Sequence, residues 1–221
     1  NDPEYNLNEA VKFYANEEAA LKDLQSGFVD AYGALSPKNV SKLGERVKIA
    51  QVPLERIIAV FLNQGSQKLF ASSDVRKALN LSVDKKQLVE KILGGYGSII
   101  DGPLPAFRAA SSETYDPEAA KNIVSKNKQE IRFTLTTAQT SELVEIAESL
   151  KNMWNEAGFK VEVKTFPVSD LESSVIGPRR YDAFLYGEEV IGKNPDPFAF
   201  WHSSQRNHPG YNIALYANSR V

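Results

Sequence analysis

The chain has 221 residues, of which 42% are hydrophobic and 24% charged, and a formal net charge of −2, which is the composition of an ordinary globular protein with a sizeable core. Its basic residues are scattered, with no run longer than a pair such as Lys85-Lys86, so a nucleic-acid binder is excluded because it needs a clustered basic face. The absence of cysteine excludes disulfides and thiolate chemistry, and no apolar run approaches the ~18 residues of a membrane span.

The first fifty residues alternate between strand-like and helix-like segments. Residues 10–15 predict a short strand, and Asn16 predicts the N-cap of a helix whose first turn is acidic. Gly27 is placed to end that helix. Residues 28–35 predict a second strand, and Pro37 favours the first turn of a short helix.

Strands and capped helices continue through the middle of the chain. Residues 46–64 predict two strands or one long bent strand, with the break at Pro53, because proline cannot donate to a ladder. Two helices follow, capped by Ser72 and Asp84. The Gly/Pro/Ser-rich residues 96–117 predict a long loop, from which Asp116-Pro117 starts another helix.

The clearest unit lies in the second half of the chain. Residues 130–137 and 159–166 read as strands, and the amphipathic residues 141–158 between them read as a helix. Strand, helix and strand joined by short loops indicate a βαβ unit with parallel strands. Residues 181–187 predict a buried strand and residues 211–217 an extended segment. The expected fold is α/β, with a mixed sheet flanked by helices.

The stretch NPDPFAFWHSSQ, residues 194–205, is the strongest candidate for a ligand-binding wall. Its prolines stiffen the backbone, and its aromatic rings provide apolar area with few rotatable bonds. We expect Phe198 to point inward and at least one of Trp201 or His202 to face a cleft. The alternative is that the same rings fill the core of their own domain.

Glu188 and Glu189 close the predicted strand 181–187. Ligands of α/β proteins tend to bind at strand ends, and two carboxylates there suit a cation or an amine. A solvated acidic turn is the competing interpretation.

Enzyme and metal chemistry have weaker signals. His202 precedes Ser203 and Ser204, but no GxSxG motif presents a serine, and the convergence of a catalytic triad is not indicated. The two histidines, His202 and His208, do not have a recognised metal-ligand spacing, and a calcium-loop pattern is missing. No catalytic residue, metal or cofactor is therefore predicted.

Several blocks of sequence occur in the order seen in one protein family. They are VKFYANEEAALKDLQSGFVDAYGALSP, FLNQGSQKLFASSDVRKALNLSVDKKQLVEKILGGYG, GPLP, YDPEAAKNIV, NEAGFKVEV, YDAFLYG, NPDPF and PGYNIALYANSRV. Together they cover nearly the whole chain. The chain resembles the extracytoplasmic solute-binding proteins of ABC importers, in the peptide, dipeptide and nickel class.

The resemblance implies a two-lobed fold that closes by a hinge around a small-molecule or peptide ligand. Residues 1–221 then form a single lobe of the C-terminal type, without the first lobe and the C-terminal return segment. The implied protein is a non-enzymatic monomer outside the cytoplasm, in the periplasm or lipid-anchored at the outer face of the cell membrane. Its implied partners are the permease subunits of the transporter, and its membrane contact is an N-terminal anchor that precedes this chain.

The resemblance also suggests how individual residues take part in binding. Asp196 matches the aspartate of the family's Asp-Pro pair, and Lys193 stands where peptide-binding members place the aspartate that pairs with a ligand's amino group. A lysine there favours an anionic group, while Glu188 or Glu189 can reach the same place. The expected ligand-binding residues are Trp201, His202, Asp196, Lys193, Asn194, Glu188, Glu189 and Phe200. A hydrolase that uses His202, and an interaction module without a small ligand, are the alternatives.

Overall fold

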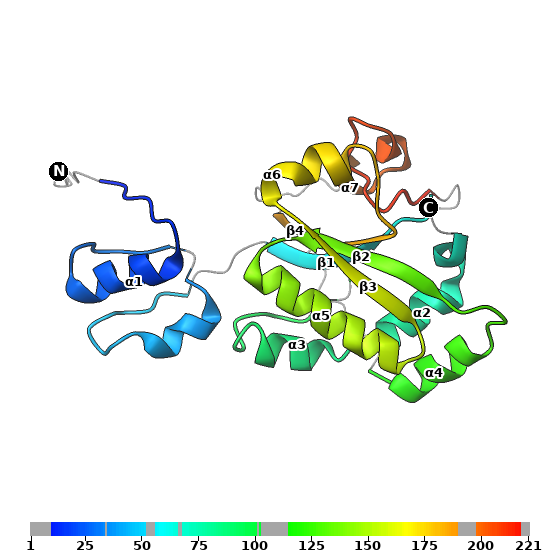
Figure 1. The fold of residues 1–221 in the computed structure, drawn as a ribbon, viewed down its shortest axis with the longest axis horizontal. Helices are drawn as coiled ribbons and strands as arrows, with labels where there is room; N and C mark the ends of the chain where they lie inside the picture. The colour runs from blue at the N-terminus through cyan, green and yellow to red at the C-terminus, as the bar shows by residue number, and fades with distance from the viewer. Residues whose placement is uncertain are drawn as a thin grey trace, which may run out of the picture. The chain divides into compact units, whose positions relative to one another are not determined.

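A computed structural model describes residues 10–33, 35–51, 56–65, 68–100, 102, 115–189 and 198–217. The chain divides into two compact units, Asn1–Val52 and Pro53–Val221. The first unit contains α1 (Glu17–Ser26) and the 3-10 helix η1 (Pro37–Lys42) (Figure 1). The second contains the sheet and all the other helices of the described residues.

Local capping signals determine the helices of the first unit. The Asn16 side chain accepts a hydrogen bond from the amide of Ala19 (3.0 Å), and Gly27 ends α1 with a φ of 76°, so both predicted ends are confirmed. Glu17 joins α1 to η1, because its carboxylate accepts from the Ser36 amide and from Asn39 Nδ2, each at 2.6 Å.

The strands predicted for the first fifty residues are wrong. Residues 10–14 and 28–33 have no strand partner in the described part of the unit, and residues 46–51 are also irregular. Lys12 and Tyr14 instead contact Asp23 of α1, at 2.6 and 2.8 Å, while Phe13 is 91% exposed. Alternation in sequence indicates an extended segment, but a strand also requires a neighbour to complete its hydrogen bonds.

The second unit is built on a four-stranded mixed sheet, which confirms the predicted fold class. Its strands run in the order β1 (Arg56–Leu62), β4 (Ala183–Glu189), β2 (Arg132–Ala138), β3 (Lys160–Phe166). Strand β2 is parallel to both β3 and β4, and β1 is antiparallel to β4. The register places Phe61 opposite Phe184 and Arg56 opposite Glu189.

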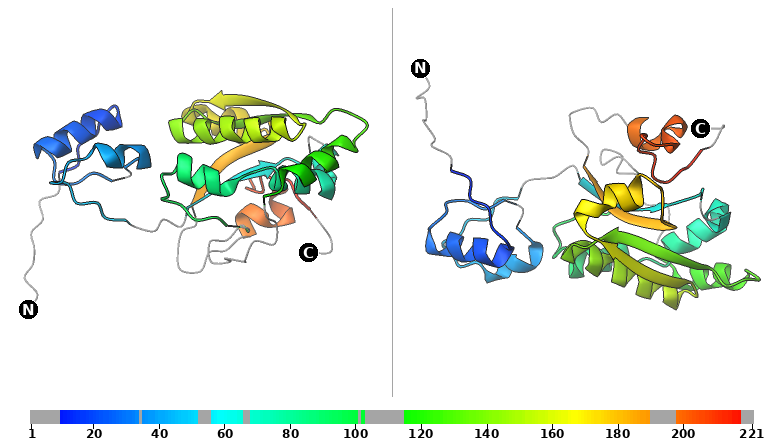
Figure 2. Two further views of the ribbon diagram at one scale, coloured as in Figure 1. Left: turned by 90° about the horizontal axis from the view of Figure 1, so that it is seen from below. Right: turned by 45° about the horizontal axis from the view of Figure 1, so that its top comes forward.

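Helices cover both faces of this sheet (Figures 1 and 2). Helix α5 packs on one face, and α6 and α7 lie on the other. The predicted caps Ser72, Asp84 and Asp116 each accept a hydrogen bond from the backbone at the start of their helices. The helices are η2 (Lys68–Ala71), α2 (Ser73–Leu81), α3 (Lys85–Lys91), α4 (Pro117–Ser125), α5 (Ser141–Glu156), α6 (Val168–Leu171), the π-helix η3 (Glu172–Ile176), α7 (Phe198–Trp201) and η4 (Ser203–Arg206).

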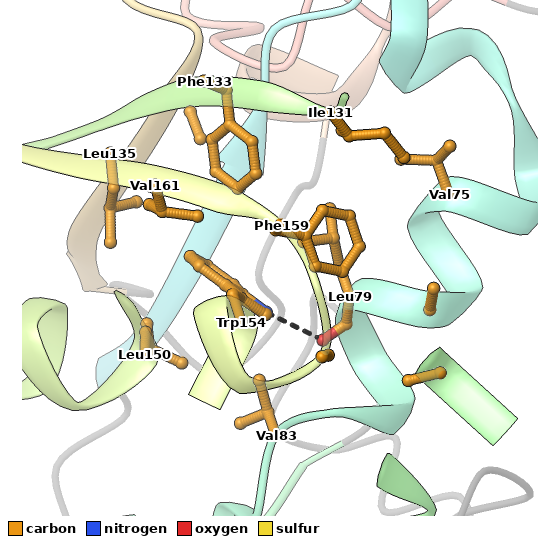
Figure 3. Packing of buried hydrophobic residues seen from close by; sticks show 14 of the residues in the cluster. Val75, Leu79, Val83, Ile131, Phe133, Leu135, Leu150, Trp154, Phe159 and Val161 are labelled. Atoms are coloured by element: carbon orange, nitrogen blue, oxygen red, sulfur yellow. Dashed lines mark hydrogen bonds between the residues drawn. The ribbon is translucent and has the colours of Figure 1, made fainter. Parts of the chain in front are cut away.

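The larger core lies between the sheet and α2, α4 and α5, and aromatic rings fill its centre (Figure 3). The ring of Phe133 is 5.3 Å from that of Phe70 and 5.6 Å from that of Trp154. Trp154 is 3% exposed, and its Nε1 donates to the Leu79 carbonyl at 3.0 Å. That bond satisfies the indole and joins α5 to α2.

The opposite face of the sheet carries a second cluster, which holds the C-terminal segment 198–217. Tyr181 Oη donates to the Ile213 carbonyl at 2.6 Å, and the Gln64 amide donates to the Ala214 carbonyl at 3.2 Å. Residues 211–217 form no strand, contrary to their predicted extended conformation, because the chain turns at Ile213 and Leu215 has a φ of 52°. This segment is therefore attached to the rest of the unit by individual hydrogen bonds and not by a strand ladder.

We predict that Trp154→Phe lowers the free energy of unfolding by about 1–3 kcal/mol, since the hydrogen bond to Leu79 is lost and a smaller ring fills the site. Urea unfolding measures the change. Lys151→Ala on the same helix removes only an exposed pair with Glu148 and is expected to cost less than about 0.5 kcal/mol. Equal midpoints for Trp154→Phe and the parent chain would contradict the role of the indole.

We predict that the buried Tyr181 side chain makes the folded chain less stable at high pH. Burial raises the pKa of Tyr181 from 10.0 to about 12, against an opposing effect of the Arg179 charge. Because the folded-state pKa is the higher one, this contribution to stability is complete below pH 10 and disappears as the pH rises toward 12. Urea midpoints measured across this window should fall more steeply for the parent chain than for Tyr181→Phe. Tyr96→Phe, at an exposed position, is the control, and parallel curves for all three proteins would refute the prediction.

Candidate ligand-binding site

The predicted ligand-binding wall contains two short helical turns joined at His202. Helix α7 is a single turn that ends at Trp201, and the His202 amide donates to the Phe198 carbonyl at 3.0 Å. His202 has an extended backbone (φ −70°, ψ 141°) and is the N-cap of η4. The turn, the cap and the next turn fix the direction of the three aromatic side chains of α7.

Trp201 lies on the sheet. Its ring centroid is 5.9 Å from that of Phe61, and the partly buried indole packs against the second cluster. Since Phe61 is opposite Phe184, Trp201 lies over the place where β1 ends and β4 begins. The indole is thus part core and part surface.

Phe198 does not point inward, so that expectation is wrong. Its side chain is 46% exposed and stacks on the imidazole of His202, with ring centroids 4.5 Å apart and an interplanar angle of 22°. The physical reason is that Trp201 occupies the contact with the sheet, which leaves Phe198 on the outer side of the one-turn helix. Phe200 takes a third direction and packs against Tyr211, with centroids 5.7 Å apart.

Asn212 holds this segment together, and the sequence reasoning missed it. The residue is 1% exposed, and its Nδ2 donates to the carbonyls of Trp201 (3.3 Å), His202 (3.2 Å) and Tyr216 (3.1 Å). Its own amide donates to the Gln205 carbonyl at 3.0 Å. A polar amide in the apolar run YNIALYA was the available signal, because a buried asparagine must find partners.

The acidic pair is on a different part of the sheet from Trp201. Glu188 and Glu189 are the last residues of β4, and their backbones pair with Ile57 and Arg56; their side chains lie outside the described part of the structure. At about 3.3 Å per residue, Glu188 is roughly 13 Å along the strand from Phe184, where the Trp201 contact lies. The other three predicted site residues, Lys193, Asn194 and Asp196, fall outside the described residues.

The surroundings of His202 do not form a catalytic triad. His202 Nδ1 is 2.8 Å from Ser204 Oγ, but within the described residues no carboxylate contacts the imidazole to orient it as a base. Nor do the described residues contain a group of three or more histidine, aspartate and glutamate side chains that could bind a metal ion. The arrangement presents rings and one imidazole edge, which suits binding.

A surface hollow of about 380 Å³ lies at the amino ends of β2 and β3, lined by α4, the end of α5 and residues 127–131. Ligands of α/β sheets bind at the carboxyl ends of strands, so this hollow is at the less favoured edge. In the described residues, no helix combines the length and the apolar character that crossing a bilayer requires.

Solved structures of binding proteins share this fold, and two of them illustrate the likeness. The oligopeptide-binding protein AppA of Bacillus subtilis, solved with a nonapeptide, is 22% identical with a TM-score of 0.76 over 92% of this chain and 44% of its own. NikZ of Campylobacter jejuni, solved with Ni(L-His), is 24% identical with a TM-score of 0.70 over 91% of this chain and 44% of its own.

Sequence comparison leads to the same group of proteins. A probable D,D-dipeptide-binding periplasmic protein of Escherichia coli is 24% identical in an alignment 226 positions long, gaps included, which covers 96% of this chain and 43% of the relative. The chain therefore spans less than half the length of that relative. Residues 7–212 match the middle part of the bacterial extracellular solute-binding proteins, family 5, which are binding proteins and not enzymes. The chain belongs to this family.

Proposed function

We propose that the chain is the ligand-binding, C-terminal-type lobe of an ABC importer's solute-binding protein, which takes up an oligopeptide or a similar small solute. The exposed aromatic segment of α7 and His202, held on a lobe of the family fold, is the observation that carries this proposal. The protein works outside the cytoplasm, in the periplasm or lipid-anchored, and delivers its ligand to permease subunits.

The aromatic segment is preorganised for binding. Asn212 fixes its backbone, and Trp201 rests on Phe61, so neither has to be ordered when a ligand arrives. Ordering a free side chain costs about 0.5–1.5 kcal/mol, and a rigid ring avoids that cost. A stiff apolar surface with few polar groups is what a site for peptides of varied sequence requires.

The distance between Trp201 and the end of β4 fits a short peptide. Trp201 and the end of β4 are separated by roughly 13 Å along the sheet. An extended peptide spans about 3.3–3.6 Å per residue, so about four residues cover this distance. A peptide lying across the sheet face is therefore long enough to meet both the rings and the strand end.

Ligand capture proceeds by hinge closure. The first lobe closes over the ligand held on this one, and only a difference in ligand affinity between the open and closed states can shift that equilibrium. Ligand contacts that form only in the closed state favour closure. Contacts that are equally strong in the open and closed states do not change the ratio of the two states.

Trp201→Ala in the full-length protein is expected to weaken peptide binding by about 1–3 kcal/mol, since the ring supplies buried apolar area to the ligand. Isothermal titration calorimetry with tripeptides measures the loss. Phe61→Leu loosens the support of Trp201 without removing the ring and is expected to cause a smaller loss. Unchanged affinity in Trp201→Ala would remove Trp201 from the site.

A further inference from the structure

We infer that His202 presents its Nε2–H as a fixed hydrogen-bond donor and so selects ligands with a carboxylate or carbonyl oxygen at this point. The selection of a ligand rests on the proposed function, whereas the tautomer and orientation of the imidazole do not depend on it. Four features of the segment support it: the contacts of Nδ1, the stacking of the ring, the bonds of the backbone and the exposure of the outer edge.

The contacts of Nδ1 determine which nitrogen carries the hydrogen. The Ser204 backbone amide points to His202 Nδ1 at 3.2 Å, and a backbone N–H can only donate. Nδ1 is therefore the acceptor, and the hydrogen of the neutral ring is on Nε2.

The side chain of Ser204 agrees with this tautomer. Gln205 Nε2 donates to Ser204 Oγ at 3.3 Å, which leaves the hydroxyl hydrogen free to point at Nδ1, 2.8 Å away. Two donors thus face the same ring nitrogen. An Nδ1–H tautomer could still donate to Ser204 Oγ, but its hydrogen would face that of the Ser204 amide, and this contact would be lost.

The position of the ring is fixed as firmly as its tautomer. Phe198 stacks on one side of the imidazole at 4.5 Å. The His202 carbonyl accepts from the Gln205 amide at 3.0 Å and from Asn212 Nδ2 at 3.2 Å, while its amide binds the Phe198 carbonyl. The ring cannot turn its Nε2 edge away without breaking the cap or the stack.

The Nε2 edge is the part left for a ligand. His202 is exposed, and within the described residues Nε2 has no hydrogen-bond partner. An N–H donor suits an acceptor oxygen, most of all a carboxylate, since charge-assisted hydrogen bonds are about twice as strong. The same tautomer disfavours an ammonium group or a metal ion at Nε2, because both need the lone pair that this nitrogen lacks.

The tautomer can be read directly, because the chain has only two histidines. We expect ¹⁵N-histidine NMR of the 221-residue chain, recorded on its neutral imidazoles, to show one ring with a bare Nδ1 and a protonated Nε2. His202→Asn assigns that ring, and His208→Asn assigns the other. A protonated Nδ1 on His202 would overturn the inference.

Two substitutions separate the cap from the donor. Asn at position 202 keeps an oxygen to cap the Ser204 amide but lacks the outer N–H, whereas Gln reaches the outer position but loses the cap. We expect His202→Asn to weaken trialanine binding by the full-length protein about tenfold and His202→Gln to restore part of it. His208→Asn is the control and should bind as the parent does.

Trialaninamide, which lacks the carboxylate, distinguishes the two acceptors. A smaller effect of His202→Asn on the amide identifies the carboxylate as the acceptor, and an equal effect identifies a peptide carbonyl. Parent-like trialanine binding by His202→Asn means that His202 is only a cap and overturns the donor role while leaving the proposed function intact. If the parent protein binds no peptide by calorimetry, the proposed function fails and the donor role falls with it, while the tautomer is still decided by NMR.

Discussion

Hydrogen bonds from a few buried side chains hold the C-terminal segment against the sheet, and the candidate site depends on them. Residues 198–217 contribute no strand to the sheet, so their position is set by Tyr181 Oη on the Ile213 carbonyl and by Asn212 Nδ2 on the carbonyls of the aromatic turn. Asn63, also buried, donates to the Tyr181 carbonyl at 2.9 Å and so ties the end of β1 to the start of β4. In a low-dielectric interior such bonds are strong, and losing one partner is costly.

Two buried atoms of this attachment, Asn212 Oδ1 and Arg179 Nε, have no hydrogen-bond partner among the residues that the structure describes. The Asn212 amide shares two hydrogens among three carbonyls, and the Arg179 guanidinium binds the Ile176 and Gly210 carbonyls with its terminal nitrogens only.

Sequence reasoning succeeded where the signal was local. The helix from Ser141, its two flanking strands and the caps Asn16 and Asp84 were predicted because periodicity and capping act within a few residues. The strand predicted at residues 10–15 was wrong because a strand needs a hydrogen-bonded neighbour, which the local sequence does not identify. The inward direction predicted for Phe198 was wrong for a similar reason. In the one-turn helix α7 the ring of Trp201, and not that of Phe198, packs against Phe61, so Phe198 points outward. Asn212 was missed because its three acceptors are four to eleven residues away.

The geometry of the site also bears on the orientation of a bound peptide. A zwitterionic peptide carries an acceptor at one end and an ammonium group at the other, so it fits two unlike subsites better than two like ones. The donor proposed at His202 Nε2 would serve as the first kind of subsite, and the carboxylates predicted from the sequence at Glu188 and Glu189 would serve as the second. Along β4, Glu188 lies roughly 13 Å from Phe184, the strand position opposite the Phe61 that Trp201 contacts. The two proposals together therefore favour a peptide whose carboxylate lies beside His202 and whose amino group lies toward the end of β4.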